Sequence, residues 1–280
     1  MLTLALGLAA SLVWGSADFL GGLSARRSPL WTVVLVAQLG GLAFAVTIWV
    51  AAAGSAPEPA ALLAGAGGGA AGVIAVAAFY RALAIGTMGV VAPIAATGAA
   101  VPVAVGLLSG ERPTAVQLVG AAVATAGVAL AARERTSGRS AAHTRSVLLA
   151  AVAAVGFGLT FVGLERAGDA DPYWAILTAR ATAAALVVLA AAAVRPRLER
   201  PSTGRGLATL VLVGVLDTAA NVLFVLAAEE GLLSVVSVLG SLYPAVTVLL
   251  ARWVLDERLD RSQAAGVVLT LLGVAGIAAG

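Results

Sequence analysis

The octapeptide FYRALAIG at residues 79–86 is followed, 145 positions later, by FVLAAEEG at residues 224–231. The two stretches share Phe, Ala and Gly at the same three positions, and each lies at the end of a long apolar run. Self-similarity of this kind is the signature of a duplicated structural unit. Further correspondences keep the same order at offsets of 143 to 146: Trp14-Gly15 with Phe157-Gly158, Pro29 with Pro172, Trp31 with Trp174, Gly120 with Gly266, and Gly127 with Gly273.

The composition excludes a water-soluble fold. Apolar residues make up 61% of the 280 positions and charged residues only 11%, whereas about a quarter of the residues of a soluble domain are charged. Such a chain needs a bilayer as its solvent. Because cysteine is absent and His143 is the single histidine, disulfide scaffolds, histidine or thiolate metal clusters and cysteine nucleophiles are excluded. We therefore expect a membrane protein that is not an enzyme and needs neither a metal nor a cofactor.

Ten apolar runs approach the length of about 20 residues that a helix needs to cross the hydrocarbon core. The most polar stretch, residues 133–145, lies between the fifth and sixth runs and is interpreted as a linker. It separates a first five-helix repeat, residues 1–132, from a second one, residues 146–280. The runs are placed at 2–22, 30–53, 60–84, 88–108, 114–132, 146–164, 173–194, 206–228, 232–252 and 262–279.

The odd number of helices in each repeat determines how the two repeats are related. After five crossings the chain lies on the opposite side of the membrane, so the second repeat enters in the opposite sense. Inverted repeats are a transporter architecture, because they offer two similar packings, one open to each side, around a site at their interface. The predicted fold class is therefore all-α and integral to the membrane, with ten transmembrane helices as two inverted five-helix repeats.

Short motifs that recur in both halves carry a resemblance to a known family. They are the pair Trp14-Gly15, the Ala-Leu-x-x-Gly pattern at 82–86, Gly110-Glu111-Arg112, Asp256-Glu257-Arg258 and the glycines of the fifth and tenth runs. With these motifs the chain resembles a ten-helix EamA-type member of the drug/metabolite transporter superfamily. The resemblance implies a secondary transporter or exporter of small metabolites, amino acids or drugs, located in the bacterial inner membrane and working without an ATP site.

The resemblance holds unequally in the two halves. The family often has an arginine in the second helix of each repeat, and Arg180 fits that place in the second half. The aligned residue of the first half is Ala37, with Gln38 beside it. Tyr243, followed by a proline, fits the proline expected in the ninth helix, whereas its counterpart is Gly98. Binding residues of the family are therefore less readily transferred to the first half.

Ionisable residues inside the apolar runs are candidates for function, since a charge at mid-membrane costs about 2.5–3.5 kcal/mol on insertion scales. Asp217 lies in the middle of its run, and Asn221 follows four residues later on the same helical face. We interpret the two as a substrate or coupling site, with a structural carboxylate as the alternative. Asp18 is nearer the end of its run, where it either faces the site or reaches the membrane interface. Arg180 needs a carboxylate partner, either Asp217 or Asp18, unless its long stem extends to the headgroups.

Three aromatic residues complete the candidate site. Trp14 is favoured for the cavity, because the other tryptophans near run ends fit the belt at the membrane interface. Tyr80 and Tyr243 present hydroxyl groups that either contact a ligand or bond a backbone carbonyl. Glu111 and Glu257 occupy equivalent turns next to arginines and are expected to stabilise those turns.

Asp217 is also the residue that we expect to couple transport to a proton. Desolvation disfavours its charged form, whereas a nearby arginine favours that form, and a change of packing switches which effect dominates. The predicted partners are thus a small-molecule substrate, the lipid bilayer and a coupling proton, with no nucleic acid, since the arginines lie mainly in loops between apolar runs.

Two other functions are alternatives to transport. A flippase of lipid-linked substrates would use the same fold. An intramembrane aspartyl protease would need Asp18 and Asp217 to share a proton, in hydrogen-bond contact with each other. Nothing in protease design requires the inverted repeat, so transport is the favoured function.

The distribution of arginines predicts the orientation of the chain. Fourteen lie in one alternate set of loops, against Arg112 and Arg166 in the other set. The positive-inside rule then places the linker in the cytoplasm and both termini outside, whereas the resemblance implies cytoplasmic termini. The fourteen are Arg26, Arg27, Arg81, Arg133, Arg135, Arg139, Arg145, Arg195, Arg197, Arg200, Arg205, Arg252, Arg258 and Arg261.

Overall fold

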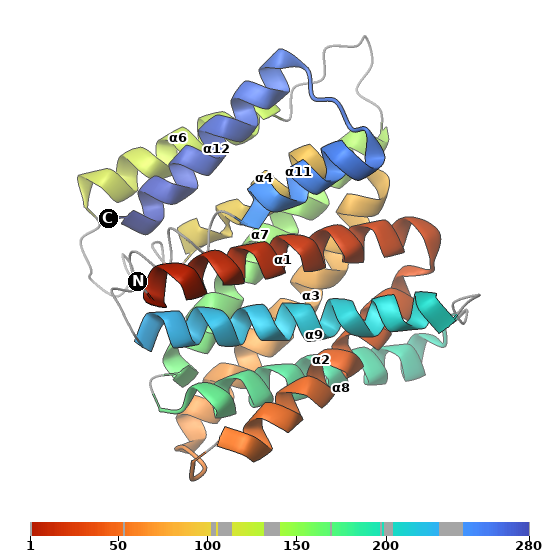
Figure 1. The fold of residues 1–280 in the computed structure, drawn as a ribbon, viewed down its shortest axis with the longest axis vertical. Helices are drawn as coiled ribbons and strands as arrows, with labels where there is room; N and C mark the ends of the chain where they lie inside the picture. The colour runs from red at the N-terminus through yellow and green to blue at the C-terminus, as the bar shows by residue number, and fades with distance from the viewer. Residues whose placement is uncertain are drawn as a thin grey trace.

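The computed structural model describes residues 2–52, 54–101, 105, 114–131, 141–168, 170–196, 198, 204–229 and 243–279. Over these residues the chain forms helices and no strand (Figure 1). The first half contains α1 (Leu2–Arg27), α2 (Leu30–Ala52), α3 (Pro59–Ile85), α4 (Met88–Ala96) with the short 3₁₀ helix η1 (Thr97–Ala99), and α6 (Ala115–Ala131). The second half contains α7 (Ala141–Gly168), α8 (Pro172–Val194), α9 (Gly204–Glu229), α11 (Tyr243–Leu255) and α12 (Arg261–Ala279).

The prediction of an all-helical membrane fold is confirmed, and some of its helices are long enough to cross the bilayer completely. Among the described residues, six helices are long and apolar enough to cross a membrane: α1, α2, α3, α7, α8 and α9. The first part of the run predicted at 88–108 forms the nine-residue helix α4 and the turn η1, and residues 102–104 and 106–108 of that run lie outside the described residues. The run predicted at 232–252 begins outside the described residues, and its visible part is the shorter apolar helix α11.

Two helices extend beyond the predicted apolar runs. Helix α1 continues to Arg27, although its run was placed at 2–22. Helix α7 begins at Ala141, so that it includes the last five residues of the predicted linker 133–145. Polar residues disfavour insertion into the hydrocarbon core, but they do not prevent a segment from being helical. A helix can therefore extend beyond the apolar run that crosses the bilayer. The rest of the linker lies outside the described residues.

The surface of the helical bundle is apolar, as a lipid-facing surface has to be. Leu63 and Trp253 expose 72% and 75% of their surface, although both are large and hydrophobic. The interior is built from alanine, glycine and valine around helix α4, whose nine residues are all buried. Small residues allow helix backbones to approach closely where no hydrophobic effect drives them together.

The start of α8 is fixed by a cap that also joins it to α2. Pro172 occupies the first helical position, and the Asp171 carboxylate accepts hydrogen bonds from the backbone N–H groups of Tyr173 and Trp174, both at 2.9 Å. The other carboxylate oxygen accepts from Gly54 N–H at 3.3 Å. The indole of Trp174 donates to the Gly54 carbonyl at 3.2 Å. This cap fixes the N-terminal end of α8, and Arg180 lies about two turns further along the same helix.

Most of the extensive helix contacts join one half of the chain to the other. Helix α1 packs on α9, and α7 packs on α3. Helix α2 also packs on α9, and α8 packs on α3. Helix α2 packs on α8, α4 packs on α11 and α7, and α1 packs on α11 and, within the first half, on α3. Helices α6 and α12 lie side by side at one edge (Figure 1).

Candidate functional site

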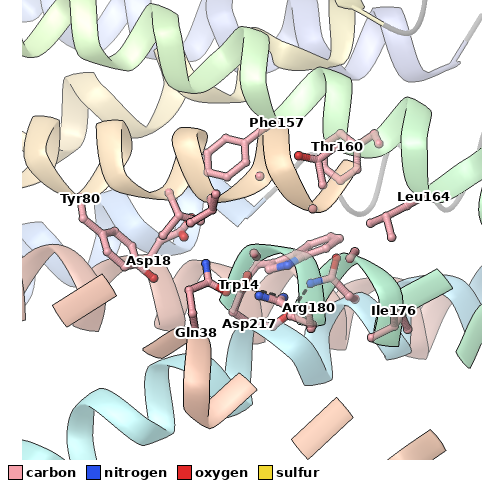
Figure 2. A pocket seen from close by; sticks show the side chains of 18 of the residues that line it. Trp14, Asp18, Gln38, Tyr80, Phe157, Thr160, Leu164, Ile176, Arg180 and Asp217 are labelled. Atoms are coloured by element: carbon pink, nitrogen blue, oxygen red, sulfur yellow. Dashed lines mark hydrogen bonds and ion pairs between the residues drawn. The ribbon is translucent and has the colours of Figure 1, made fainter. Parts of the chain in front are cut away.

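A cavity of about 90 Å³ lies among helices of both halves (Figure 2). Its lining includes polar and aromatic side chains at the centre of an otherwise apolar bundle. All seven residues that the sequence singled out line it: Trp14, Asp18, Tyr80, Arg180, Asp217, Asn221 and Tyr243. A volume of this size holds a few water molecules but is smaller than the 300–1,000 Å³ of typical ligand pockets.

The helices that line the cavity differ partly from those expected. For a site at the interface of two inverted repeats, we expect the first, third and fourth runs to face the sixth, eighth and ninth. Helices α1, α3, α7, α9 and α11 do line it, but no described residue of α4 does, because that helix is buried elsewhere in the core. Helices α2 and α8 contribute in addition, through Gln38 and through Arg180 with its neighbours. Gln38 is thus a lining residue that the sequence analysis did not assign to the site.

Two close helix crossings bring Gln38 and Arg180 to the cavity. Gly69 of α3 lies against the backbone of Ala179 in α8, with no room for a side chain between them. Gly214 of α9 lies in the same way against the backbone of Ala37 in α2. Each crossing alanine precedes one of the two polar residues, so the glycines set how far Gln38 and Arg180 reach inward.

The centre of the cavity holds an ion pair. The Arg180 guanidinium lies 2.6 Å from Oδ2 of Asp217, and the two side chains are only 12% and 23% exposed. The sequence left the partner of Arg180 open between Asp217 and Asp18, and the structure selects Asp217. The Asn221 amide donates to the backbone carbonyl of Asp217 at 2.6 Å, so it bonds the helix rather than the Asp217 carboxylate.

Aromatic rings form one wall of the cavity. The indole of Trp14 lies 5.5 Å from the ring of Phe224 and 6.3 Å from the rings of Phe161 and Tyr243, measured between ring centroids. Trp14 is 9% exposed, so the expectation that it belongs to the cavity rather than to an interfacial belt fits its position. Edge-to-face and tilted contacts of this kind stabilise a defined ring arrangement.

Three further polar residues line the same cavity: Asp18, Gln38 and Tyr80 (Figure 2). The Tyr80 ring packs directly on Gly21, three residues after Asp18 on the same helical face. Asp18 and Tyr80 are therefore close enough to interact electrostatically. Gln38 is 3% exposed, and its Oε1 atom is buried without a hydrogen-bond partner.

The contact that an aspartyl protease would need is not formed. Among the described residues no hydrogen bond joins Asp18 to Asp217, and the Asp217 carboxylate is engaged by Arg180 instead. The geometry therefore speaks against a shared proton between these two carboxylates.

The turn residue Glu257 bridges three helix ends outside the cavity. Its carboxylate lies 2.8 Å from the Arg26 guanidinium at the end of α1 and accepts from Gly89 N–H in α4 at 3.3 Å. Arg26 also donates to the carbonyls of Leu83 and Gly86 at the end of α3. The position of Glu257 agrees with the structural role expected for it, whereas Glu111 lies outside the described residues.

Comparison with known proteins agrees with this fold. A model of the EamA-like transporter family matches residues 144–279. Among solved structures, one crystal structure of a protein matches 96% of this chain over 97% of its own length, with a TM-score of 0.66 and 20% sequence identity, which shows a shared fold alone. No curated protein matches the chain. The family match shows that residues 144–279, which include the whole second repeat expected from the sequence except its last residue, belong to the EamA-like transporter family of the drug/metabolite transporter superfamily.

Proposed function

We propose that the protein is a secondary transporter that moves small metabolites, amino acids or drugs across the bacterial inner membrane by alternating access. The family is one of membrane transporters. The position of an ion pair in a cavity between helices of both halves supports the proposal of alternating access. Three features of the chain carry the argument: its packing, the residues that line its cavity and the Arg180–Asp217 pair.

The packing supports two inverted repeats, residues 1–132 and 146–280. If α1 corresponds to α7, α2 to α8, α3 to α9, α4 to α11 and α6 to α12, the contact of α1 with α9 becomes the contact of α7 with α3, which is also present. The contact of α2 with α9 likewise becomes that of α8 with α3. The contact of α1 with α11 becomes that of α7 with α4, and the pairs α2 with α8, α4 with α11 and α6 with α12 each join a helix to its own counterpart. A two-fold relation between the halves accounts for these contacts, whereas the contact of α1 with α3 has no extensive equivalent in the second half among the described residues.

The cavity lining supports the same relation. Positions that correspond in the sequence alignment, at offsets of 143 or 145, occur on both sides of the cavity. Because each member of such a pair comes from a different half, the site lies where two inverted repeats would rock against each other. The pairs are Trp14 with Phe157, Asp18 with Phe161, Gly72 with Asp217, and Val76 with Asn221.

The single observation that carries the proposal is the Arg180–Asp217 ion pair within the cavity. The two residues belong to α8 and α9, so rearrangement of these helices changes the distance between the charges. In one packing Arg180 neutralises Asp217, and in another Asp217 takes a proton or a substrate group. A free-energy difference of about 1.4 kcal/mol between the two packings corresponds to a tenfold change in their populations. Coupling of this kind requires no ATP.

The test is uptake into proteoliposomes by the variant Asp217→Asn, which keeps the shape of the side chain but cannot ionise. The substrate comes from a screen in a strain that lacks related exporters, scored by resistance or efflux. We expect the variant to lose concentrative uptake driven by a proton gradient while it retains exchange. The control Asp256→Asn makes the same chemical change at a side chain that is 84% exposed. Wild-type accumulation by Asp217→Asn, with unchanged pH dependence, would contradict the proposed coupling.

A further inference from the structure

The polar groups of the cavity fall into two sets. Arg180 and Asp217 bind each other, and Asn221 bonds a backbone carbonyl. The second set consists of the Asp18 carboxylate, the Gln38 amide and the Tyr80 hydroxyl. Within the described part of the chain, these three groups make no side-chain hydrogen bond or ion pair, although they line the same cavity. Unpaired polar groups inside a membrane protein need an explanation, because each costs free energy to bury.

Gln38 gives the sharpest signal of the three. It is 3% exposed, and its buried Oε1 atom has no partner. A buried acceptor without a partner is unfavourable, so the amide is expected to find one during the functional cycle. Rotation of the amide exchanges its oxygen and nitrogen. The carbonyl oxygen can therefore turn toward the cavity without any movement of the helix.

The charge balance indicates which kind of partner is missing. The charged side chains that line the cavity, among the described residues, are Asp18, Asp217 and Arg180. Arg180 neutralises Asp217, so the negative charge of an ionised Asp18 has no counter-ion in the cavity. Asp217 lies near enough to repel that charge further. Tyr80 and Tyr243 also line the cavity, but a tyrosine hydroxyl is neutral at ordinary pH and supplies no counter-ion.

We propose that Asp18, Gln38 and Tyr80 form a subsite that binds an ammonium group of the substrate through its N–H donors. This inference rests on the transport function proposed above and narrows its substrates to amines. A primary ammonium carries three donors, and the subsite offers three acceptor groups, one from each residue. Trp14 and Phe161 line the same cavity and provide an aromatic surface for the apolar body of the compound.

The subsite discriminates among cations by its chemistry. A quaternary ammonium has no N–H group, so it leaves the Gln38 oxygen and the Tyr80 oxygen without a donor. A neutral alcohol of the same shape supplies a donor but leaves the Asp18 charge uncompensated. Binding should therefore follow the order primary ammonium, quaternary ammonium, neutral alcohol, since charge-assisted hydrogen bonds are the stronger kind.

The experiment measures equilibrium binding to the purified full-length protein in detergent micelles. The probe is tritiated 2-phenylethylammonium, with 2-phenylethanol and N,N,N-trimethyl-2-phenylethylammonium as competitors. We expect Asp18→Asn to weaken probe binding about ten- to hundredfold, as loss of a charged hydrogen-bond partner does. Gln38→Met, of similar size without polar atoms, should weaken it about two- to tenfold. The control Asp256→Asn should bind like the wild type.

The following results would overturn the inference. No binding of the probe to the wild type, equal competition by the alcohol, or unchanged binding by Asp18→Asn would each exclude the ammonium subsite. Displacement of the probe by millimolar sodium, lost in Asp18→Asn, would assign the subsite to an inorganic cation instead. Failure of the inference is distinct from failure of the transport function. A protein that transports a substrate from the screen but binds no ammonium keeps its function, and one that binds ammonium without transport keeps the subsite.

Discussion

The Arg180–Asp217 ion pair can be tested for stability separately from transport, by a double-mutant cycle. The variants are Arg180→Gln, Asp217→Asn and the two combined. Each single variant leaves one charge unpaired in the cavity. The combined variant removes both charges and leaves two neutral side chains that can still hydrogen-bond to each other.

The magnitude follows from burial. The side chains are 12% and 23% exposed at a separation of 2.6 Å, and removal of one member of a buried pair costs about 3–5 kcal/mol. Because the adjoining cavity admits water, we expect about 3 kcal/mol for each single variant, near the low end of that range. The combined variant should cost little more than either single one. The coupling energy is then about 3 kcal/mol, as for residues in direct contact.

The assay is the free energy of unfolding, from titration with sodium dodecyl sulfate in mixed micelles. The matched control is the surface pair Arg258 and Asp256, which lies 3.6 Å apart with both side chains 84% exposed. Its cycle should give under about 0.5 kcal/mol, as exposed pairs do. If the Arg180–Asp217 cycle gave no more than this control, the pair would not be an energetic unit and the reasoning from burial would be refuted.

Three further predictions concern the scaffold. Glu257→Gln should lower the free energy of unfolding by about 1–2 kcal/mol in the same titration, because the bond to the Arg26 guanidinium loses its charge; an unchanged value would show that the turn does not depend on it. Gly214→Leu should abolish the monodisperse peak in size-exclusion chromatography, since Ala37 leaves no room, whereas Gly67→Leu, with nothing within 4 Å, should keep it; equal profiles would contradict the close crossing. A C-terminal alkaline phosphatase fusion should be active if the arginine count sets the topology, and activity only of a cytoplasmic reporter would favour the family orientation.

The helical fold was predictable because the hydrophobic pattern carries most of the information in a membrane protein. Each described helix overlaps an apolar run that the sequence identifies. Helix ends were less predictable, since α1 reaches Arg27 and α7 begins at Ala141. Hydropathy locates the hydrocarbon core, but helix ends depend on loop contacts such as those of Arg26.

The members of the candidate site were predictable because polar letters are rare inside apolar runs. The ion pairs among these residues were not predictable. Arg180 had two possible partners in the sequence, and only the packing of α8 near α9 selects Asp217 over Asp18. The sequence marks Gln38 only as the neighbour of an aligned position, because, unlike Asn221, it has no ionisable residue one helical turn away. Its role emerges only from its burial and its unpaired oxygen.

The asymmetry of the site bears on the direction of transport. In the proposed inverted repeat, exchange of the two packings would be nearly neutral for the backbone, because each helix takes over the contacts of its counterpart. The chemistry is not exchanged, since Asp18 corresponds to Phe161, and Asp217 corresponds to Gly72. The two packings therefore place the Asp18 subsite and the Arg180–Asp217 pair in different surroundings. A ligand shifts the equilibrium only by its difference in affinity for the two states. Because the charges are unequally distributed between the repeats, such a difference can arise even when the two backbone packings are equal in energy.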